Sequence, residues 1–236
     1  MERAFLYGDL LFETMLAEGG SVALISQHYS RLANAAAVLK MDLCGLNEEK
    51  FNTQSLQALQ NFNPTPKKGE KHRIRYTLYR ESKGTYLPDS NQSNFNISIS
   101  RFEPKNAAEI HQLGIYPDQQ KAPGKLSNLK SGNALIYVMA SIWAKENNLD
   151  GALICNTNGY IIESDNSNIF WRKNGVWFSP PLTDGCIAGI GRELFIASHQ
   201  VTEKSCTETD LLNADECILT NALYLKRNFK FTTHNS

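Results

Sequence analysis

The sequence predicts an α+β protein with two domains, and two observations support this fold class. In the first half, the runs 72–81 and 95–103 alternate apolar and polar residues, which predicts long strands with one buried face. In the second half, many short apolar runs are separated by turns rich in glycine and asparagine and alternate with helical patterns. We therefore expect a two-layer α/β domain followed by a domain of short strands with helices at its rim.

The remaining elements of the first half follow from residue periodicity. Segments 12–18 and 21–25 predict strands joined by the turn EGGS, because glycine permits the tight reversal. Segments 28–41 and 47–62 carry apolar residues at helical spacing and predict two amphipathic helices. Together these elements predict an antiparallel sheet covered by two helices.

A segment with linker composition separates the two halves. The stretch PDQQKAPGK at 117–125 is rich in proline, glycine and polar residues, as domain linkers are. We therefore expect an N-terminal domain at 1–116 and a C-terminal domain at 126–236. In the latter we expect a helix at 126–144, strands at 152–155, 160–164, 168–172, 176–180 and 217–225, a helix at 189–200 and a helical turn at 209–216.

Composition excludes several classes of function. The 236 residues contain 24 Lys and Arg and 24 Asp and Glu, so the balanced charge argues against nucleic acid or a membrane surface as partner. Five cysteines occur without CxxC or zinc-ligand spacing, so we expect neither a disulfide framework nor a metal site. No signal peptide and no apolar run of about 20 residues is recognisable, so we expect a cytoplasmic protein.

One lysine precedes the apolar helix pattern, in the stretch LSNLKSGNAL. Lys130 has leucine neighbours and is followed by Ser131, Gly132 and Asn133. A solvated lysine is the ordinary alternative, but a positive charge is disfavoured at a helix N-terminus. A lysine removed from water has a lowered pKa and becomes a nucleophile for carbonyl groups. Lys130 is therefore a candidate catalytic residue.

Three further stretches contain candidate binding residues. In YIIESDNSNIF, Glu163 ends a strand and Asn168 follows a polar turn, a pattern also common at surfaces. In GCIAGIGRELF, glycines precede a helix whose N–H groups could bind a phosphate, although a plain glycine-rich helix entry fits equally well. In HYSRL, Arg31 could form paired hydrogen bonds with a phosphate, and a surface arginine is the alternative.

Together these stretches resemble the class IV aminotransferase family, the fold-type IV pyridoxal-phosphate (PLP) enzymes. The resemblance covers nearly the whole chain and rests on blocks that occur in the family's order: YGDLLFETM (7–15), HYSRL (28–32), LKSGNAL (129–135), GYIIESDNSNIFW (159–171), PLTDGCIAGIGR (181–192) and ADECILTNAL (214–223). It implies a small two-layer α/β sandwich, a C-terminal pseudo-barrel with helices, a PLP site in the cleft of the two domains, and a homodimer.

The resemblance also implies roles for individual residues. Lys130 matches the lysine that holds PLP as a Schiff base and moves protons, and Glu163 matches the carboxylate that faces the pyridine nitrogen. Arg31 matches a phosphate-binding arginine. The other expected cofactor-binding residues match the family's phosphate-side turns and its Ser-Asn pair: Asn168, Ile190, Gly191, Asn221 and Ala222.

The carboxylate of an amino-acid-like substrate needs a cation. Arg73 and Arg75 share one face of a strand, and Arg75 resembles an arginine of the family's corresponding strand. A structural role as a bridge to acidic neighbours is the alternative. Arg80 and Tyr86 mark the limits of a loop that could cover the site. They are further candidates for contacting the substrate.

The resemblance leaves three functions open. The ending ADECILTNAL looks most like 4-amino-4-deoxychorismate lyase, which abstracts an α-proton with lysine and releases pyruvate and 4-aminobenzoate, a folate precursor. Asn133 occurs in the lyase and D-amino-acid groups, and Leu135 replaces the tyrosine typical of branched-chain enzymes. The alternatives are an aminotransferase of the D-amino-acid or branched-chain type, and a non-catalytic PLP-binding or scaffold homodimer. Leu10 stands where the family usually has glycine, which bears on substrate identity.

Overall fold

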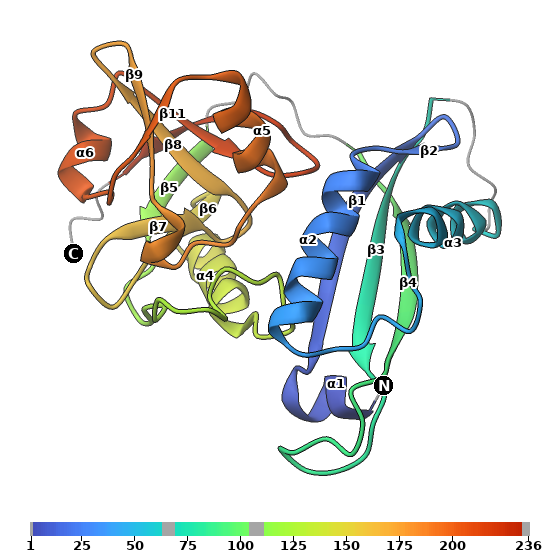
Figure 1. Cartoon of the computed structure of the whole chain (residues 1–236). Helices are drawn as coiled ribbons and strands as arrows, with labels where there is room; N and C mark the ends of the chain where they lie inside the picture. Colours follow the sequence, from blue (N-terminus) through green and yellow to red (C-terminus); the bar gives the residue numbers. More distant parts are fainter. Residues whose placement is uncertain (1, 63–68, 104–110, 233–236) are drawn as a thin grey trace. The chain divides into compact units, whose positions relative to one another are not determined.

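The computed structural model describes residues 2–62, 69–103 and 111–232 (Figure 1). Contacts between Cα atoms divide the chain into two compact units. The first unit contains Met1–Pro104 together with the short segment Leu129–Asn133, and the second contains Lys105–Asn128 and Ala134–Ser236. The segment that carries Lys130 therefore belongs to the first unit, although the residues on both sides of it belong to the second.

The first unit consists of a sheet covered by two helices. The sheet is antiparallel with the strand order β2-β1-β3-β4, formed by β1 (Leu10–Glu18), β2 (Ser21–Val22), β3 (Lys71–Arg80) and β4 (Ser93–Arg101). Helices α2 (Ile25–Val38) and α3 (Glu48–Gln60) pack on one face of this sheet, and the short helix α1 (Glu2–Tyr7) precedes β1.

The alternation seen in the sequence decides which face of this sheet is covered. Leu11, Met15 and Ile74 are buried against Leu32 of α2 and Phe51 of α3. Because successive side chains of a strand point to opposite faces, the residues between them lie on the other face. That second face carries Phe12, Thr14, Leu16, Arg73, Arg75 and Thr77, with Thr14 opposite Arg75 and Leu16 opposite Arg73.

The second unit is built on one mixed sheet of eight strands in the order β10-β9-β8-β11-β12-β5-β6-β7. The strands are β5 (His111–Ile115), β6 (Gly151–Cys155), β7 (Ile161–Ser164), β8 (Asn168–Lys173), β9 (Val176–Ser179), β10 (Val201–Glu203), β11 (Glu216–Thr220) and β12 (Arg227–Phe231). The helices are α4 (Leu135–Glu146), α5 (Ile190–Ser198) and α6 (Glu208–Leu212), with a 3₁₀ turn at Leu182–Asp184.

The chain connection between β7 and β8 requires this sheet to curl. The two strands lie five positions apart in the strand order, which would separate them by about 24 Å in a flat sheet. Only three residues connect Ser164 to Asn168, and such a connection spans at most about 14 Å. The sheet therefore bends back on itself, as Figure 1 shows, and encloses a core that includes Leu153, Ile169 and Trp171.

These two architectures confirm the expected fold class, a two-layer α/β part followed by a pseudo-barrel with helices. The division of the chain differs from the expected boundary at 117–125. β5 lies within the range 1–116 expected for the N-terminal domain, but it pairs in parallel with β12 and β6 of the second unit. Among the described residues, no helix has the length and hydropathy needed to cross a membrane.

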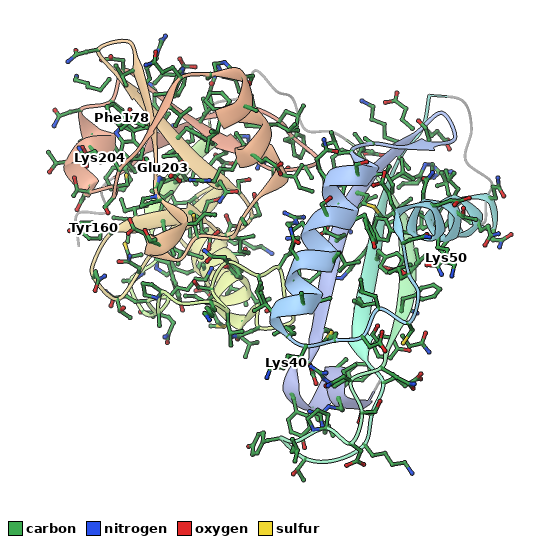
Figure 2. The ribbon with its side chains drawn as sticks, in the orientation of Figure 1. Lys40, Lys50, Tyr160, Phe178, Glu203 and Lys204 are labelled. Atoms are coloured by element: carbon green, nitrogen blue, oxygen red, sulfur yellow. The ribbon has the colours of Figure 1, made fainter. Side chains whose placement is uncertain are left out.

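Several elements differ from the sequence prediction. The helix expected at 126–144 begins only at Leu135, and α2 begins at Ile25 because β2 has only two residues. The edge strand β10 was not expected, since it has three residues and a mixed polar pattern. At this edge the side chains of Phe178 and Lys204 lie together (Figure 2), with Lys204 Nζ 5.8 Å from the centroid of the Phe178 ring.

Candidate active site

Lys130 lies on an extended segment that adds to the edge of β1. The backbone N–H of Phe12 donates to the Lys130 carbonyl at 3.0 Å, and the N–H of Gly132 donates to the Leu10 carbonyl at 3.0 Å. A Cβ on Gly132 would lie 2.9 Å from the Gly8 carbonyl oxygen, so glycine permits this close approach. Lys130 is therefore held by strand-like pairing, where the sequence predicted a helix.

The side chain of Lys130 lies over an aromatic ring of the same unit. Its Nζ is 4.4 Å from the centroid of the Phe12 ring, and the guanidinium carbon of Arg75 is 3.6 Å from that centroid. Two cations therefore share one aromatic ring, which attracts each of them through its quadrupole. Lys40 and Lys50 are exposed lysines of the same unit (Figure 2), whereas Lys130 is half-buried.

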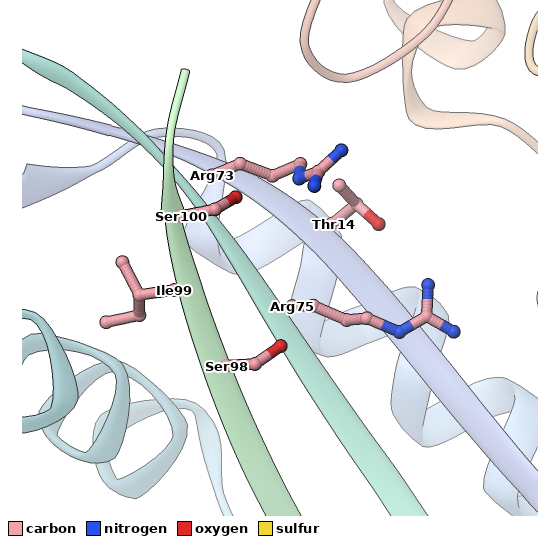
Figure 3. A pocket seen from close by; sticks show the side chains of 6 residues that line it. All are labelled: Thr14, Arg73, Arg75, Ser98, Ile99 and Ser100. Atoms are coloured by element: carbon pink, nitrogen blue, oxygen red, sulfur yellow. The ribbon is translucent and has the colours of Figure 1, made fainter.

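A shallow pocket of about 370 Å³ begins next to Phe12 on the same sheet face. It is lined by Thr14, Arg73, Arg75, Ser98, Ile99 and Ser100. Figure 3 shows both arginine side chains and Thr14 extending to the same side of the sheet. Partial burial lowers the pKa of the Arg75 guanidinium, and the charge of Arg73 lowers it further.

The pocket has the chemistry of an anion site. Within the described ranges, no ion pair involves Arg73 or Arg75, although other residues of this sheet form ion pairs, such as Lys71 with Glu18 and Arg80 with Asp9. Two neighbouring cations repel each other, so an anion that contacts both relieves that repulsion. Hydroxyl groups of Thr14, Ser98 and Ser100 can donate further hydrogen bonds to a carboxylate.

Arg31 lies on the covered side of the first unit and is oriented by Glu13. Arg31 Nε donates to Glu13 Oε1 at 2.8 Å, and its Nη2 contacts Glu13 Oε2. Nδ1 of the fully buried His28 donates to the same Oε2 at 2.6 Å. Burial would raise the pKa of the Glu13 carboxyl, but Arg31 and His28 together hold it below its ordinary value. The carboxylate therefore stays charged and fixes the guanidinium in one orientation.

The structure does not bring Arg80 and Tyr86 to this pocket. Arg80 is buried and donates to Asp9 Oδ2 at 2.9 Å, to Asn91 Oδ1 at 2.6 Å and to the Leu39 carbonyl at 2.6 Å. It therefore ties together the end of α2, the start of β1 and the loop before β4. Tyr86 is exposed and packs on Tyr7 with ring centroids 5.5 Å apart.

Glu163 lies on β7 of the second unit and is only 2% exposed. Its Oε1 accepts hydrogen bonds from Lys121 Nζ at 2.7 Å and from the Tyr137 hydroxyl at 2.8 Å. Its Oε2 accepts one from the backbone N–H of Ile187 at 2.8 Å. Burial raises the pKa of Tyr137, and the Glu163 carboxylate raises it further, so the hydroxyl remains a donor.

The first turn of α5 approaches two other segments of the second unit closely. A Cβ on Gly189 would lie 1.9 Å from Asn168 Oδ1, and one on Gly191 would lie 2.8 Å from the backbone nitrogen of Asn221. Glycine at both positions therefore lets the helix N-terminus sit against β8 and the turn after β11. The structure thus brings together four residues expected to bind the cofactor, Asn168, Ile190, Gly191 and Asn221, with Ala222 next in the chain.

Asn221 builds the turn that faces α5. Its Oδ1 accepts the backbone N–H groups of Leu223 at 3.0 Å and Tyr224 at 2.8 Å. Its Nδ2 donates to Ser167 Oγ at 3.0 Å, and Arg227 Nη2 donates to the same oxygen at 2.9 Å. These bonds fix the turn that follows β11 against the turn between β7 and β8.

Sequence reasoning did not single out Lys121, Tyr137 or Arg227. Lys121 lies in the segment that was expected to be a linker, and Tyr137 lies within an apolar helix pattern. Arg227 lies in the segment YLKRNFKF, in which no pattern indicates a buried arginine. Local sequence offers no signal for these three residues, because their partners are far away in the chain.

The sequence pattern of the family described as amino-transferase class IV matches residues 10–228, which is most of the chain. The chain belongs to the class IV aminotransferase family. Over 229 residues it is 29% identical to a protein of Methanocaldococcus jannaschii provisionally named a branched-chain-amino-acid aminotransferase, a match that covers 93% of this chain and 77% of that protein.

Two further similar proteins are named as lyases. Over 232 residues the chain is 24% identical to the aminodeoxychorismate lyase of Vibrio harveyi, with 94% of this chain and 82% of that protein covered. Among solved structures, a Legionella pneumophila protein provisionally named 4-amino-4-deoxychorismate lyase superposes with a TM-score of 0.86 at 24% identity. That superposition covers 99% of this chain and 85% of the other chain and concerns the fold.

Membership of the class IV family confirms that the protein is a PLP-dependent enzyme, either an aminotransferase or a lyase. The family acts on amino-acid substrates, which are small molecules.

Residues of the second unit fit this cofactor. The Thr220 hydroxyl at the end of β11 is fully buried and has no hydrogen-bond partner among the described residues, which marks a place for an external acceptor. It precedes Asn221, whose backbone closely approaches Gly191 at the N-terminus of α5. Helix N-termini favour phosphate through their free N–H groups, so this corner suits the phosphate group of PLP.

Proposed function

We propose that the protein is a PLP-dependent 4-amino-4-deoxychorismate lyase, which forms pyruvate and 4-aminobenzoate. The observation that carries this proposal is the pocket with Arg73 and Arg75 on the sheet face of Phe12 and Lys130. The proposed substrate has two carboxylates, one on its ring and one on its enolpyruvyl group. A branched-chain amino acid has an apolar side chain instead, and this pocket offers it two cations and three hydroxyl groups.

In this proposal Lys130 holds the cofactor covalently and moves the proton. Its Nζ takes the proton from the carbon that bears the amino group of the substrate. The electron pair left behind completes the aromatic ring, and the C–O bond to the enolpyruvyl oxygen breaks. The leaving enolate takes up a proton and becomes pyruvate, so no water or second substrate is consumed. PLP supplies the electron sink for this proton transfer.

Other residues hold the cofactor in the proposal. Glu163 accepts a hydrogen bond from the ring nitrogen of PLP, and Asn168 lies beside the ring. Arg31 binds the phosphate, together with the backbone N–H groups of Ile190 and Gly191 and the turn at Asn221 and Ala222. Arg75 binds a substrate carboxylate, and Arg73 assists it. Glu13 holds the guanidinium of Arg31 in one orientation, and this supports the proposed role of Arg31 in binding the phosphate.

We also propose a cytoplasmic homodimer that contributes to folate synthesis. All five cysteines are free, and Cys155, Cys186, Cys206 and Cys217 are buried, as suits a reducing compartment. Self-association is supported by an exposed apolar stripe on α4. The stripe is formed by Leu135, Val138, Met139 and Ile142. Light scattering of the purified protein measures the mass and tests the dimer.

An aminotransferase is the second candidate, and the observation that favours it is the higher identity to the relative from Methanocaldococcus jannaschii, 29% against 24%. The experiment is a side-by-side assay of PLP-loaded protein. One arm supplies 4-amino-4-deoxychorismate and measures pyruvate and 4-aminobenzoate. The other supplies leucine, valine or D-alanine with 2-oxoglutarate and measures glutamate.

We expect equimolar formation of pyruvate and 4-aminobenzoate, and we expect Lys130→Ala to abolish it. Glutamate formation without 4-aminobenzoate identifies an aminotransferase and overturns the lyase proposal. Protein that binds PLP and turns over neither substrate supports the non-catalytic alternative. Lys50→Ala, which changes an exposed lysine of the same unit, is the matched control for protein handling.

A further inference from the structure

Three side chains of the second unit form a closed triangle of hydrogen bonds. Lys121 Nζ donates to the Tyr137 hydroxyl at 2.6 Å and to Glu163 Oε1 at 2.7 Å. The Tyr137 hydroxyl donates to the same Oε1 at 2.8 Å. The residues come from three different places in the chain: the segment after β5, α4 and β7.

The triangle leaves one acceptor site on the carboxylate. An ionised carboxylate has about four lone-pair positions, two on each oxygen. Lys121 and Tyr137 occupy both positions of Oε1, and the backbone N–H of Ile187 occupies one position of Oε2 at 2.8 Å. The remaining position lies on Oε2 and can accept one hydrogen bond.

Lys121 compensates the charge of this buried carboxylate. The side chains of Lys121 and Glu163 are 13% and 3% exposed. Among the described residues, Lys121 is the one cation that forms an ion pair with Glu163. Burial raises the pKa of the neighbouring Cys186 thiol to about 12, and Glu163 contributes, so this thiol stays neutral beside the pair. An isolated buried carboxylate tends to take up a proton instead of remaining charged.

The backbone of Lys121 is also fixed. Its N–H donates to the Cys155 carbonyl at 2.9 Å, and its carbonyl accepts the N–H of Thr157 at 3.3 Å. A single β-bridge pairs it with Asn156, directly after β6. The backbone that carries the Lys121 ammonium group is therefore held in a defined position. A lysine in a mobile linker would lack this support.

We propose that Lys121 is a positioning residue that keeps Glu163 charged and leaves its one open acceptor position, on Oε2, for the ring nitrogen of PLP. This inference rests on the cofactor role of Glu163 in the proposed function. Tyr137 completes the arrangement by occupying the second position of Oε1. Glu163 then accepts a charge-assisted hydrogen bond from the protonated ring nitrogen, which is stronger than a bond between neutral groups.

The experiment compares two cofactors at one pH. Cofactor-free protein is titrated with PLP and with a PLP analogue that has carbon in place of the ring nitrogen, and tryptophan fluorescence reports both dissociation constants. The wild-type protein is expected to prefer PLP by about 10-fold or more, because the analogue cannot donate to Glu163. Lys121→Met is expected to lose most of this preference, and Lys121→Arg is expected to keep it.

The control and the second readout separate positioning from stability. Lys173→Met removes a lysine that pairs with Asp215 at the surface of the same unit at 3.4 Å, and it should retain the wild-type preference. ¹⁵N NMR of ring-labelled PLP should show a protonated ring nitrogen in the wild type and loss of that proton in Lys121→Met. If Lys121→Met does not fold, Lys121→Gln takes its place and must show the same losses.

Two outcomes overturn the inference. An unchanged preference and an unchanged nitrogen signal in Lys121→Met mean that the lysine serves only stability. A preference that rises means that Lys121 competes with the ring nitrogen for the carboxylate. If the wild-type protein takes up no PLP at all, the proposed function itself fails, so the two failures are distinguishable.

Discussion

Lys130 Nζ lies 4.4 Å from the centroid of the Phe12 ring, on the sheet face that also carries Arg75. The pairing of residues 129–133 with β1 produces this relationship, since the Phe12 N–H donates to the Lys130 carbonyl. The amine that we propose to react is therefore placed by a segment with sheet hydrogen bonds, which is more rigid than a loop. A rigid scaffold is what a group needs if it is to transfer a proton at a defined position.

The first prediction concerns covalent attachment of the cofactor. Borohydride reduction of PLP-loaded protein should fix the cofactor on Lys130, as peptide mass mapping would show. Lys130→Ala should bind PLP without any attachment that survives denaturation, because alanine has no amine. Lys50→Ala should label like the wild type, since Lys50 is exposed on α3. Label on another lysine of the wild type would contradict the role of Lys130.

The second prediction concerns the glycines at the start of α5. Gly191→Ala would place a Cβ 2.8 Å from the Asn221 backbone nitrogen, so the turn after β11 must shift. We expect a loss of stability of about 1–3 kcal/mol, the usual cost of overpacking, and PLP binding at least about 10-fold weaker. Ser198→Ala, at the exposed end of the same helix, is the control. Wild-type PLP affinity in Gly191→Ala would show that this turn is not part of the phosphate site.

The third prediction is a pH dependence of stability that originates at Glu13. Its pKa is lower in the folded protein than the ordinary 4.5, so the unfolded chain binds a proton more readily in the window below 4.5. The contribution of Glu13 to the free energy of unfolding is fully present above pH 4.5. It is lost as the pH falls through the folded pKa.

Urea unfolding of the wild type and of Glu13→Gln at several pH values measures this effect. Glu13→Gln should cost about 3–5 kcal/mol near pH 7, because it breaks a buried ion pair with Arg31. The difference between the two proteins should shrink below pH 4.5. A difference that stays constant down to acid pH would show that the charge of Glu13 is not what stabilises the protein.

The fourth prediction separates substrate binding from cofactor binding. Arg75→Gln should raise KM for the dicarboxylate substrate by roughly 10- to 100-fold, because a charge-assisted hydrogen bond is lost, while PLP affinity stays unchanged. Arg73→Gln should raise KM in the same direction. Arg101→Gln, on the neighbouring strand but outside the pocket, should have wild-type kinetics. An unchanged KM in Arg75→Gln would remove this pocket from the substrate site.

Much of the fold could be predicted from local pattern. The alternation in 72–81 and 95–103 appears in the structure as β3 and β4, because a half-buried strand must alternate. The helix predicted at 47–62 is observed as α3, with Asn47 as its N-cap accepting the Lys50 N–H at 2.9 Å. Short strands such as β10, and β12 with its charged sequence RNFKF, carry too little pattern to be recognised.

Some residues of the candidate site could likewise be predicted from the sequence, and others only from the fold. Lys130, Glu163 and Gly191 stand in sequence blocks that resemble one family, so a single chain suffices to select them. Lys121 lies 42 residues from Glu163 and was assigned to a linker, and only the fold shows that they form an ion pair. The helix predicted from 126 begins only at Leu135, and within the missing part the segment 130–132 pairs with β1 instead of forming helix.

By itself, the sequence determined the class of elements, the family and the residues that we propose for the chemistry, since these depend on periodicity and on motifs of a few residues. The tertiary structure alone decided that Lys130 and Arg75 both lie against the Phe12 ring, that Gly191 approaches the turn at Asn221, and that Lys121 forms an ion pair with Glu163. The physical reason is that each of these relationships joins distant parts of the chain. Local sequence encodes which groups must be buried or hydrogen-bonded, but not which distant partner satisfies them.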